Sequence, residues 1–302
     1  MAQTVLILGG RGKIGKHAAE AFSSAGWQVR HYTRGTDMVQ AARGADVIVN
    51  GLNPPNYHNW AKLIPEITQQ VIAAAQASGA TVIIPGNVYN FGDKGGVWDE
   101  TTPHTPVTRK GKIRVEMEAA YRAAGVQTII LRAGNFIDPH RNGDVYSMLM
   151  VNKVGKGVIT SIGAPDAQQA YAYLPDWARA AVALAEKRMQ LAAFEDVPFP
   201  GHSFTTRDLQ ASLERSLGRM LKLRRFPWWG VTLAAPFNEL MRELREMRYL
   251  FDTSHSLGAD KFNRLLPDFV PTDFDTVALA GLPPDVHPDQ MMRPGSVTVP
   301  AE

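Results

Sequence analysis

A glycine-rich turn near the amino terminus constrains the fold of this chain more than any other feature. Thr4 to Leu8 form a run of β-branched and aliphatic residues, and Gly-Gly-Arg-Gly-Lys-Ile-Gly follows at residues 9–15. Small and apolar residues then recur at helical spacing from Ile14 to Phe22. Because glycine has no Cβ, the backbone can turn sharply beside a phosphate, while a helix amino terminus directs N–H groups at the anion. The segment therefore predicts a strand, a tight turn and a helix around a dinucleotide pyrophosphate.

The same alternation continues along the chain. Further strands are predicted at Gln28–Tyr32, Asp46–Asn50, Thr81–Ile84 and Thr128–Leu131, and helices at Met38–Ala42, Trp60–Ala77 and Gly111–Ala123. Strands that alternate with helices indicate an α/β fold with a Rossmann-type, doubly wound parallel sheet. Between Arg34 and Asp46 there is room for a helix but not for an additional strand and helix. We therefore expect the outer strand of the sheet to be missing or short.

The sequence changes character after about residue 195. Pro198 and Pro200 precede a predicted helix at Thr206–Leu217, a strand at Leu221–Phe226 and the apolar, helix-rich segment Trp228–Leu250. From Pro283 onward no periodicity remains, which predicts a tail that wraps over the surface or frays. We expect a Rossmann domain at 1–195 and a smaller, mostly helical lobe with the tail at 196–302, the two lobes being interleaved.

Composition and charge argue against several classes of protein. The 32 Lys and Arg residues are spread along the chain against 29 Asp and Glu, so no nucleic-acid partner is expected. There is no cysteine, and the eight His residues form neither an HExxH pair nor a close cluster in the sequence, so no metal site is expected. No apolar stretch approaches the ~18 residues of a membrane span, and no basic segment precedes the first apolar run. A cytoplasmic protein without a membrane partner is the expectation.

The end of the second strand indicates which dinucleotide is bound. An NAD site typically presents an Asp or Glu there for the adenosine ribose, whereas this chain reads His31-Tyr32-Thr33-Arg34. A guanidinium is always charged and binds phosphate oxygens in a bidentate manner, which suits the 2′-phosphate of NADP. Arg11, within the glycine turn, is a second candidate for that phosphate. We therefore predict NADP(H) as the cofactor; the alternative is that both arginines are solvated surface residues.

With these residues in place, the chain resembles the extended and atypical short-chain dehydrogenase/reductases, the group that includes NAD-dependent epimerases and dehydratases. The resemblance covers roughly residues 3–190 and rests on four segments in the family's order. These are the GxxGxxG turn at 9–15, the Val-Tyr and Phe-Gly pairs at 88–92, Leu-Arg-Ala-Gly-Asn-Phe at 131–136 and Tyr-Leu-Pro-Asp-Trp-Ala at 173–178. The resemblance implies that the cofactor is bound by Gly9, Gly10, Arg11, Gly12, Lys13, Ile14, Arg34, Gly51, Leu52, Asn53, Lys112, Ala133, Gly134 and Asn135.

The departures from the family fall in the catalytic centre. Members usually carry Tyr-x-x-x-Lys, in which the lysine binds the nicotinamide ribose and the tyrosine passes a proton, and a Ser or Thr shares the substrate oxygen. Matching Lys112 to the lysine, with Glu116 four residues on, puts Thr108 at the tyrosine position. The Ser or Thr position falls at about Pro85. Because an aliphatic hydroxyl is a poor acid near neutral pH, the usual proton relay is absent.

Three residues are candidates for the remaining chemistry. Lys112 is expected to bind the nicotinamide ribose, although Lys110 competes for the register and Lys112 could be a surface lysine. Asn87 is expected to donate a hydrogen bond to a substrate oxygen. Tyr89 is a candidate replacement acid, as is His104, because both should lie at the carboxyl ends of strands; a purely structural role is the alternative for each.

These features predict an NADP(H)-dependent oxidoreductase that acts on a small carbonyl, imine or activated double bond. The substrate is expected to be apolar if aromatic and methionine residues of the smaller lobe line a cleft; those residues are otherwise core. They are Tyr146, Met148, Met150, Trp228, Trp229, Phe237 and Met241. The alternatives are a non-catalytic NADP(H)-binding sensor or scaffold, which the altered triad favours, and a nucleotide-sugar epimerase or dehydratase. A homodimer is compatible with the family.

Overall fold

The computed structural model describes residues 2–286, and a six-stranded parallel sheet forms its centre. The strands are β1 (Thr4–Leu8), β2 (Gln28–His31), β3 (Val47–Asn50), β4 (Thr81–Gly86), β6 (Thr128–Arg132) and β10 (Phe194–Pro198), in the order β10-β6-β4-β3-β1-β2. This arrangement confirms the predicted Rossmann-type sheet. β2 lies at the edge of the sheet, as expected from the short segment between Arg34 and Asp46.

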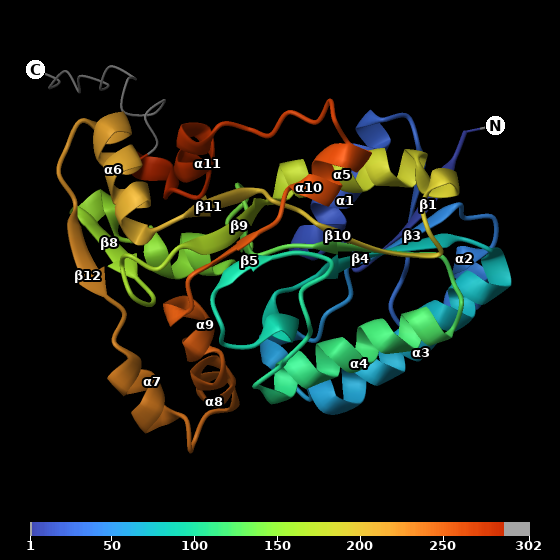
Figure 1. Cartoon of the computed structure of the whole chain (residues 1–302), viewed down its shortest axis with the longest axis horizontal. Helices are drawn as coiled ribbons and strands as arrows, with labels where there is room; N and C mark the ends of the chain where they lie inside the picture. Colours follow the sequence, from blue (N-terminus) through green and yellow to red (C-terminus); the bar gives the residue numbers. More distant parts are fainter. Residues whose placement is uncertain (1, 287–302) are drawn as a thin grey trace, which may run out of the picture.

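Helices cover both faces of the sheet (Figure 1). One face carries α1 (Lys13–Ser24) and α5 (Leu174–Glu186), and the other carries α2 (Met38–Ala42), α3 (Trp60–Ser78) and α4 (Arg109–Ala123). Because successive side chains of a strand point to opposite faces, Val5 and Ile7 pack in the core under α1 and α5, while Leu6 and Leu8 pack under α3. Both faces are apolar, which explains the nearly continuous hydrophobic runs in these strands.

A second lobe combines segments from both halves of the chain. β7 (Asn135–Ile137) and β9 (Gln169–Tyr173) form a sheet with β11 (His202–Phe204), and β8 (Val158–Ser161) pairs with β12 (Lys222–Arg225). The helices of the lobe are α6 (Thr206–Leu217), α7 (Trp228–Ala234), α8 (Glu239–Glu246), α9 (Arg248–Asp252) and α11 (Phe274–Ala280). These pairings favour interleaved lobes, and the boundary at residue 195 stays a prediction.

Two segments between α9 and α11 return to the first lobe. β13 (His255–Leu257) pairs with β5 (Gly96–Trp98), and α10 (Asp260–Leu265) packs beside β10. Short helical turns complete the elements at Pro55–Tyr57 (η1), Tyr89–Phe91 (η2), Tyr146–Met150 (η3), Val154–Lys156 (η4), Arg188–Gln190 (η5) and Pro284–Val286 (η6). The predicted tail lies mostly outside the described residues. Among those described, no helix is both long and apolar enough to cross a bilayer.

Candidate functional site

The glycine turn forms the junction between β1 and α1. Gly9 has a φ of +76°, the left-handed conformation that favours glycine, and its carbonyl accepts a hydrogen bond of 2.8 Å from the N–H of Gly12. α1 begins directly afterwards, at Lys13. The first N–H groups of a helix have no partner within it, so the turn presents donors and the positive end of the helix dipole at the carboxyl edge of the sheet.

The glycines of this turn have different physical roles. A Cβ on Gly15 would lie 2.3 Å from the carbonyl oxygen of Gly9, and one on Gly9 would lie 2.8 Å from that of Gly51. Gly9, Gly15 and Gly51 therefore permit α1, β1 and β3 to approach closely. A Cβ on Gly12 would contact only the Gly9 oxygen, at 3.3 Å. Gly12 thus has no comparable packing constraint, and its missing side chain leaves room for a ligand.

Other residues of the turn are divided between core and surface. Ile14 is buried in the core, and Arg11 is exposed. Lys13 donates a hydrogen bond from Nζ to the carbonyl of Gly143, 2.8 Å away, which ties the turn to the loop after β7. Burial lowers the pKa of Lys13, and nearby Asp144 and Asp138 oppose that shift.

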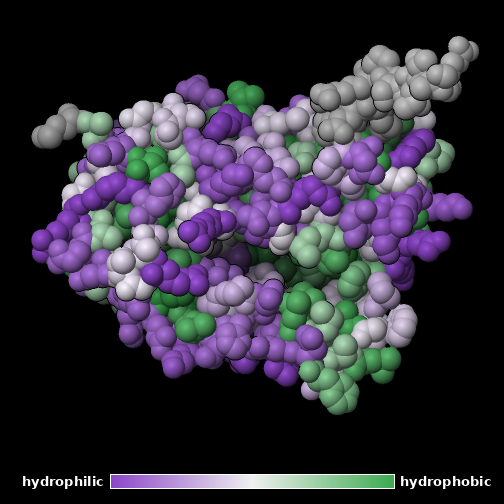
Figure 2. All heavy atoms as spheres, turned by 180° about the vertical axis from the view of Figure 1, so that it is seen from behind, coloured by the Kyte–Doolittle hydropathy of each residue, from purple (hydrophilic) through white to green (hydrophobic). Residues whose placement is uncertain are grey.

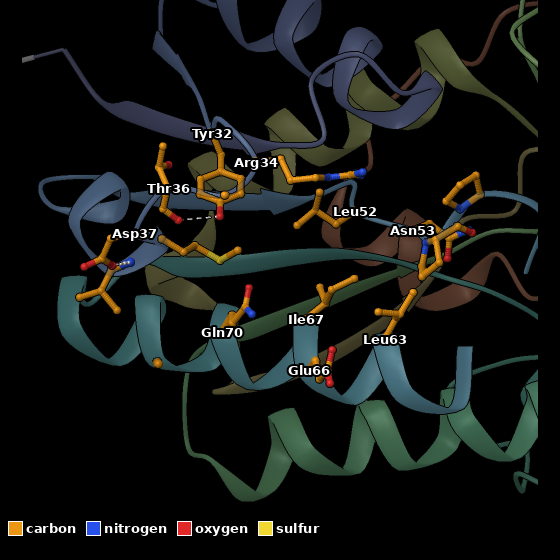
Figure 3. A pocket seen from close by; sticks show the side chains of 16 residues that line it. Tyr32, Arg34, Thr36, Asp37, Leu52, Asn53, Leu63, Glu66, Ile67 and Gln70 are labelled. Carbon is orange, nitrogen blue, oxygen red and sulfur yellow. Dashed lines mark hydrogen bonds between the residues drawn. The ribbon is translucent and has the colours of Figure 1, made fainter. Parts of the chain in front are cut away.

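A cavity of about 660 Å³ lies beside the turn, between α2, α3 and the carboxyl ends of β2 and β3 (Figure 3). In Figure 3 the side chain of Arg34 extends across the top of this cavity, above Leu52. Leu63 and Ile67 approach from α3 on the opposite side. The cavity thus brings together the predicted residues Arg34, Leu52 and Asn53. Among its lining carboxylates, that of Asp37 already caps α2 by accepting from the N–H groups of Val39 and Gln40.

Arg114 contacts Asn53 of the cavity lining and was not predicted from the sequence. Its Nη2 donates a 2.9 Å hydrogen bond to Oδ1 of Asn53, and its guanidinium lies 4.6 Å from the centre of the Trp60 ring. Burial lowers the pKa of Arg114, while the nearby Tyr89 and Glu118 raise it. The structure thus places a fixed cation between the cofactor-side residue Asn53 and the end of β4.

Lys112 does not join this group. It is exposed, and so is Glu116. With 100° per residue, Lys112 lies about 160° around α4 from Arg114, on the side away from the sheet. Lys110, the other candidate for the register, is fully buried and forms ion pairs with Glu243 and Glu246 of α8. These contacts attach α8 to the first turn of α4.

Thr108 caps α4, because its side-chain oxygen accepts a 3.1 Å hydrogen bond from the N–H of Gly111. We therefore expect Thr108→Val to lower the free energy of unfolding by about 1 kcal/mol, the usual cost of losing such a cap. Thr108→Ser should retain the stability. Urea denaturation of the two variants measures this difference, and equal stability of Thr108→Val and the wild type would contradict the capping role.

The carboxyl end of β4 presents Asn87 and Tyr89. Asn87 accepts a 3.0 Å hydrogen bond from the N–H of Tyr89, which leaves its side-chain amide to act as a donor. The hydroxyl groups of Tyr89 and Tyr57 lie 3.5 Å apart. The charge that Tyr89 would carry, together with burial, raises the pKa of Tyr57 well above its usual range. Tyr57 therefore stays protonated and can donate a hydrogen bond.

The loop that carries Tyr57 has a strained backbone. Asn56, Tyr57 and Asn59 all have positive φ values, of 53°, 59° and 47°. Non-glycine residues adopt this conformation at a cost of about 1–3 kcal/mol each, and such residues cluster at functional sites. α8 holds the loop from outside through the 2.9 Å contact between Nδ1 of His58 and Oε2 of Glu239. The strained loop thus presents Tyr57 to Tyr89.

At the end of β6, a buried ion network fixes the neighbouring strand ends. Arg132 donates to Glu118 of α4 and Asp196 of β10, and also to the carbonyl of Asn87, 2.7 Å away. Burial would lower the pKa of Arg132, but the charges of Glu118 and Asp196 raise it above its ordinary value. Glu118 is thus the glutamate of α4 that is buried at this site, two residues after the Glu116 of the sequence pattern. The network holds β4, β6, α4 and β10 at one edge of the sheet.

The three residues after Arg132 approach the second lobe. A Cβ on Gly134 would lie 2.1 Å from the carbonyl of Ala170, so Gly134 permits close contact with β9. Ala133 is buried, and the buried Nδ2 of Asn135 has no hydrogen-bond partner among the described residues. An unpaired buried amide donor at a strand end indicates a position where a ligand can supply the acceptor.

His104 packs edge-on against Phe91, with 5.4 Å between ring centres. Burial, and then the charge of Arg132, lowers the pKa of His104. The imidazole is therefore neutral near pH 7, which makes it a weaker candidate than the tyrosine pair for donating a proton.

The aromatic and methionine residues of the smaller lobe differ widely in exposure. Trp229 and Phe237 are 72% and 92% exposed, and Figure 2 shows hydrophobic residues at the lower right end of the molecule, where α7 lies. Tyr146 and Met150 are buried core residues, and Met148 is half exposed. The interpretation of Trp229 and Phe237 as core residues is therefore wrong, because both side chains are exposed, whereas their place in a substrate cleft stays a prediction.

Comparison with known proteins places these observations in a family context. Residues 5–89 match the model of the NAD dependent epimerase/dehydratase family. A search among curated proteins finds no significant sequence match. The matched segment contains the glycine turn, β2, β3, the Asn87–Tyr89 end of β4 and the residues that line the 660 Å³ cavity, whereas Arg114 lies outside it.

Solved structures match the fold over nearly the whole chain. "MoeE5 in complex with UDP-glucose and NAD" has a TM-score of 0.72 at 12% identity, covering 92% of this chain and 97% of that one. The UDP-glucuronic acid 4-epimerase from Bacillus cereus in complex with NAD has a TM-score of 0.71 at 16% identity, with 93% and 97% covered. A nucleoside-diphosphate-sugar epimerase from Pseudomonas aeruginosa has a TM-score of 0.70 at 14% identity, with 96% and 98% covered. The family match and this shared fold confirm the resemblance to the epimerase/dehydratase-like short-chain dehydrogenases.

Proposed function

We propose that this epimerase/dehydratase-like chain is an NADP(H)-dependent oxidoreductase with an altered catalytic centre. The observation that carries the proposal is the continuity of three features at one sheet edge: the glycine turn at the start of α1, the 660 Å³ cavity beside it and the polar residues at the ends of β4 and β6. A dinucleotide requires such a sequence of sites for its pyrophosphate, its adenosine and its nicotinamide.

The cavity supports binding of the adenosine half. Leu52, Leu63 and Ile67 offer apolar contacts for a flat base, and the N–H groups of α1 suit the pyrophosphate. The dinucleotides bound in the solved relatives are NAD, and a nicotinamide dinucleotide of either form fits the fold. Two observations support the choice of NADP(H) for this chain. Arg34 lines the cavity, and the residues at the end of β2 include no carboxylate.

The choice of cofactor makes a prediction about Arg34. Arg34→Ala should weaken NADPH binding by about 10- to 100-fold, because one charge-assisted hydrogen-bonding group is lost, and should leave NADH affinity nearly unchanged. Fluorescence titration of both dinucleotides measures the ratio. Arg225→Ala, which removes an exposed arginine of β12 outside the cavity lining, is the matched control. An equal loss for NADPH and NADH in Arg34→Ala would exclude the assignment to the 2′-phosphate.

The catalytic end combines Asn87, Tyr89 and Tyr57 with the cation of Arg114. When bound, the cofactor would supply or accept a hydride at the nicotinamide C4. We propose that the amide of Asn87 orients a substrate oxygen and that the Tyr57–Tyr89 pair transfers the proton. Arg114 would hold the nicotinamide ribose in place of the family's lysine, since it is charged and lies beside Asn53. In this proposal, different residues orient the substrate, transfer the proton and bind the ribose, while hydride transfer by the cofactor is retained.

A pair of variants distinguishes the two candidates on α4. Arg114→Met should weaken NADPH binding by about tenfold or more, because it removes the cation that contacts Asn53 of the cavity lining. Lys112→Met, which shortens an exposed side chain on the far side of the helix, should change NADPH affinity less than twofold. The reverse pattern would return the ribose-binding role to Lys112. Circular dichroism of both variants checks that the fold is intact.

The likeness to nucleotide-sugar epimerases favours a second candidate, a nucleotide-sugar epimerase or dehydratase. The position of the family's tyrosine argues against this candidate. That position holds Thr108 if Lys112 matches the family's lysine, and Lys110 if Arg114 replaces it. Incubation with UDP-glucose and UDP-glucuronic acid, followed by chromatography of the sugars, tests this candidate. NADPH oxidation with a panel of small apolar aldehydes and ketones tests the oxidoreductase. Binding of NADPH without turnover in either assay would favour the sensor.

A further inference from the structure

A second cavity, of about 720 Å³, lies on the opposite face of the sheet from Arg34, between α1, α5 and the loop after β7. His17 and Glu20 of α1 line it, and so does His140 of the loop. Nδ1 of His17 lies 3.7 Å from Oε2 of Glu20, and Nε2 of His140 lies 3.9 Å from the same oxygen. All three ligand atoms lie within 4.8 Å of one another. Two imidazoles and one carboxylate are a donor set that suits zinc.

A hydrogen bond to Asp138 holds the ring of His17 in a fixed orientation. Its Nε2 lies 2.9 Å from Oδ1 of Asp138, and both side chains are almost fully buried. Asp138 is held in turn by the N–H of His140, 2.9 Å from the same oxygen. A neutral His17 that donates Nε2–H to Asp138 has its lone pair on Nδ1, which faces Glu20. Metal-binding histidines typically donate their other ring N–H to a carboxylate in this way.

Nδ1 of His17 and Oε2 of Glu20 are 3.7 Å apart, which is beyond hydrogen-bond distance. A second His and carboxylate group, His104 with Glu118 and Asp196, has similar spacing, but Arg132 already binds both of those carboxylates. In the group formed by His17, Glu20 and His140, the ion-pair contacts found among residues 2–286 are those of the three residues with one another and with Asp138.

We propose that His17, Glu20 and His140 bind one divalent zinc-type metal ion, with Asp138 orienting His17. The edge of a tetrahedral zinc site is about 3.4 Å, given metal–nitrogen distances of about 2.0–2.1 Å. The observed spacings of 3.7 and 3.9 Å need only a small contraction. The rings of His17 and His140 lie nearly parallel, with 17° between their planes, so His140 turns to direct Nε2 at the ion. His140 and Glu20 are about half exposed and can make that movement, while His17 stays fixed.

The remaining coordination position opens into the cavity, where water can bind. The ion also connects α1, which begins at the pyrophosphate turn, to the loop that follows β7. Lys13 already makes such a connection through the carbonyl of Gly143. A bound metal would therefore add a second tie between these two segments.

Equilibrium dialysis of tag-free, chelator-treated full-length protein against Zn²⁺, with metal measured by mass spectrometry, tests the proposal. We expect one zinc per chain with a dissociation constant in the micromolar range or below. Glu20→Gln and His140→Ala alter exposed side chains and should each weaken binding by about tenfold or more. Glu186→Gln makes the same charge change in the same cavity outside the ligand set, and should bind zinc like the wild type.

Less than one tenth of an equivalent of zinc bound at 50 µM free metal, roughly ten times a micromolar-range constant, would overturn the proposal. So would uptake that Glu20→Gln and His140→Ala leave unchanged, or that Glu186→Gln reduces equally. Titration of NADPH into Glu20→Gln should give the wild-type affinity. The outcome of the zinc measurement is therefore independent of the proposed oxidoreductase function.

Discussion

Gly12→Val is expected to abolish dinucleotide binding and to leave the fold intact. Gly12 has φ −81° and ψ 163°, which any residue adopts, and a Cβ there meets only the Gly9 oxygen at 3.3 Å. The branched side chain would instead project into the space in front of α1, where we propose that the pyrophosphate binds. Loss of two or more charge-assisted hydrogen bonds corresponds to more than about 100-fold in affinity. NADPH titration measures the loss, and thermal unfolding measures the fold.

Gly15→Ala provides the contrast within the same turn. Its Cβ would lie 2.3 Å from the oxygen of Gly9 and 2.7 Å from the carbonyl carbon, so the backbone of the turn must move. Overpacking of this kind costs about 1–3 kcal/mol. We expect a clearly lower melting temperature for Gly15→Ala than for Gly12→Val. Unchanged NADPH affinity in a folded Gly12→Val variant would show that the turn does not hold the pyrophosphate.

Removal of the Arg132 guanidinium should have the largest effect on stability. Arg132→Met leaves the carboxylates of Glu118 and Asp196 without their common partner, and breaking a buried ion pair from one side costs about 3–5 kcal/mol. The carbonyl of Asn87 also loses its donor, so the end of β4 should become less ordered. Urea denaturation, with the midpoint and slope compared to the wild type, measures the change.

Arg207→Met is the matched control on the surface. Arg207 pairs with Asp166, and both side chains are more than half exposed. Solvent screens such a pair, so the substitution should cost less than about 1 kcal/mol. A loss below 1 kcal/mol in Arg132→Met as well would contradict the description of Arg132 as the link between β4, β6, α4 and β10.

Much of the sheet could be predicted because its signals are local. Continuous apolar runs such as Val47–Asn50 mark strands buried on both faces, and glycines mark the turns between strands and helices. The short segment between Arg34 and Asp46 was enough to predict the missing outer strand. The glycine turn and Arg34 could be proposed as cofactor-binding residues from the sequence because each comes shortly after a predicted strand.

The register of α4 was harder because two patterns overlap. Lys112 and Glu116 have the spacing of the family's Lys-x-x-x-Glu, and so do Arg114 and Glu118 when arginine replaces lysine. The apolar residues Ile113, Met117 and Tyr121 mark the buried face of the helix. They favour the second pair, because Arg114 directly follows Ile113 and Glu118 directly follows Met117. That helical periodicity was the available signal for Arg114.

Contacts between distant segments had no such signal. Lys110 meets Glu243 across more than a hundred residues, and His17 meets Asp138 across 121. The sequence shows no cluster of histidines, because His17 and His140 come together only when α1 packs beside the loop after β7. The left-handed residues Asn56, Tyr57 and Asn59 were also unforeseen, and their loop contacts α8, which lies far along the chain.

Titration of NADPH into the purified protein, followed by nicotinamide fluorescence and calorimetry, tests the central claim most directly. The account predicts saturable binding of one NADPH per chain in the micromolar range, with weaker binding of NADH. It also predicts that Gly12→Val removes this binding and that Arg34→Ala removes the preference for NADPH. Absence of saturable binding of either dinucleotide at millimolar concentration, with the protein folded, would contradict the account.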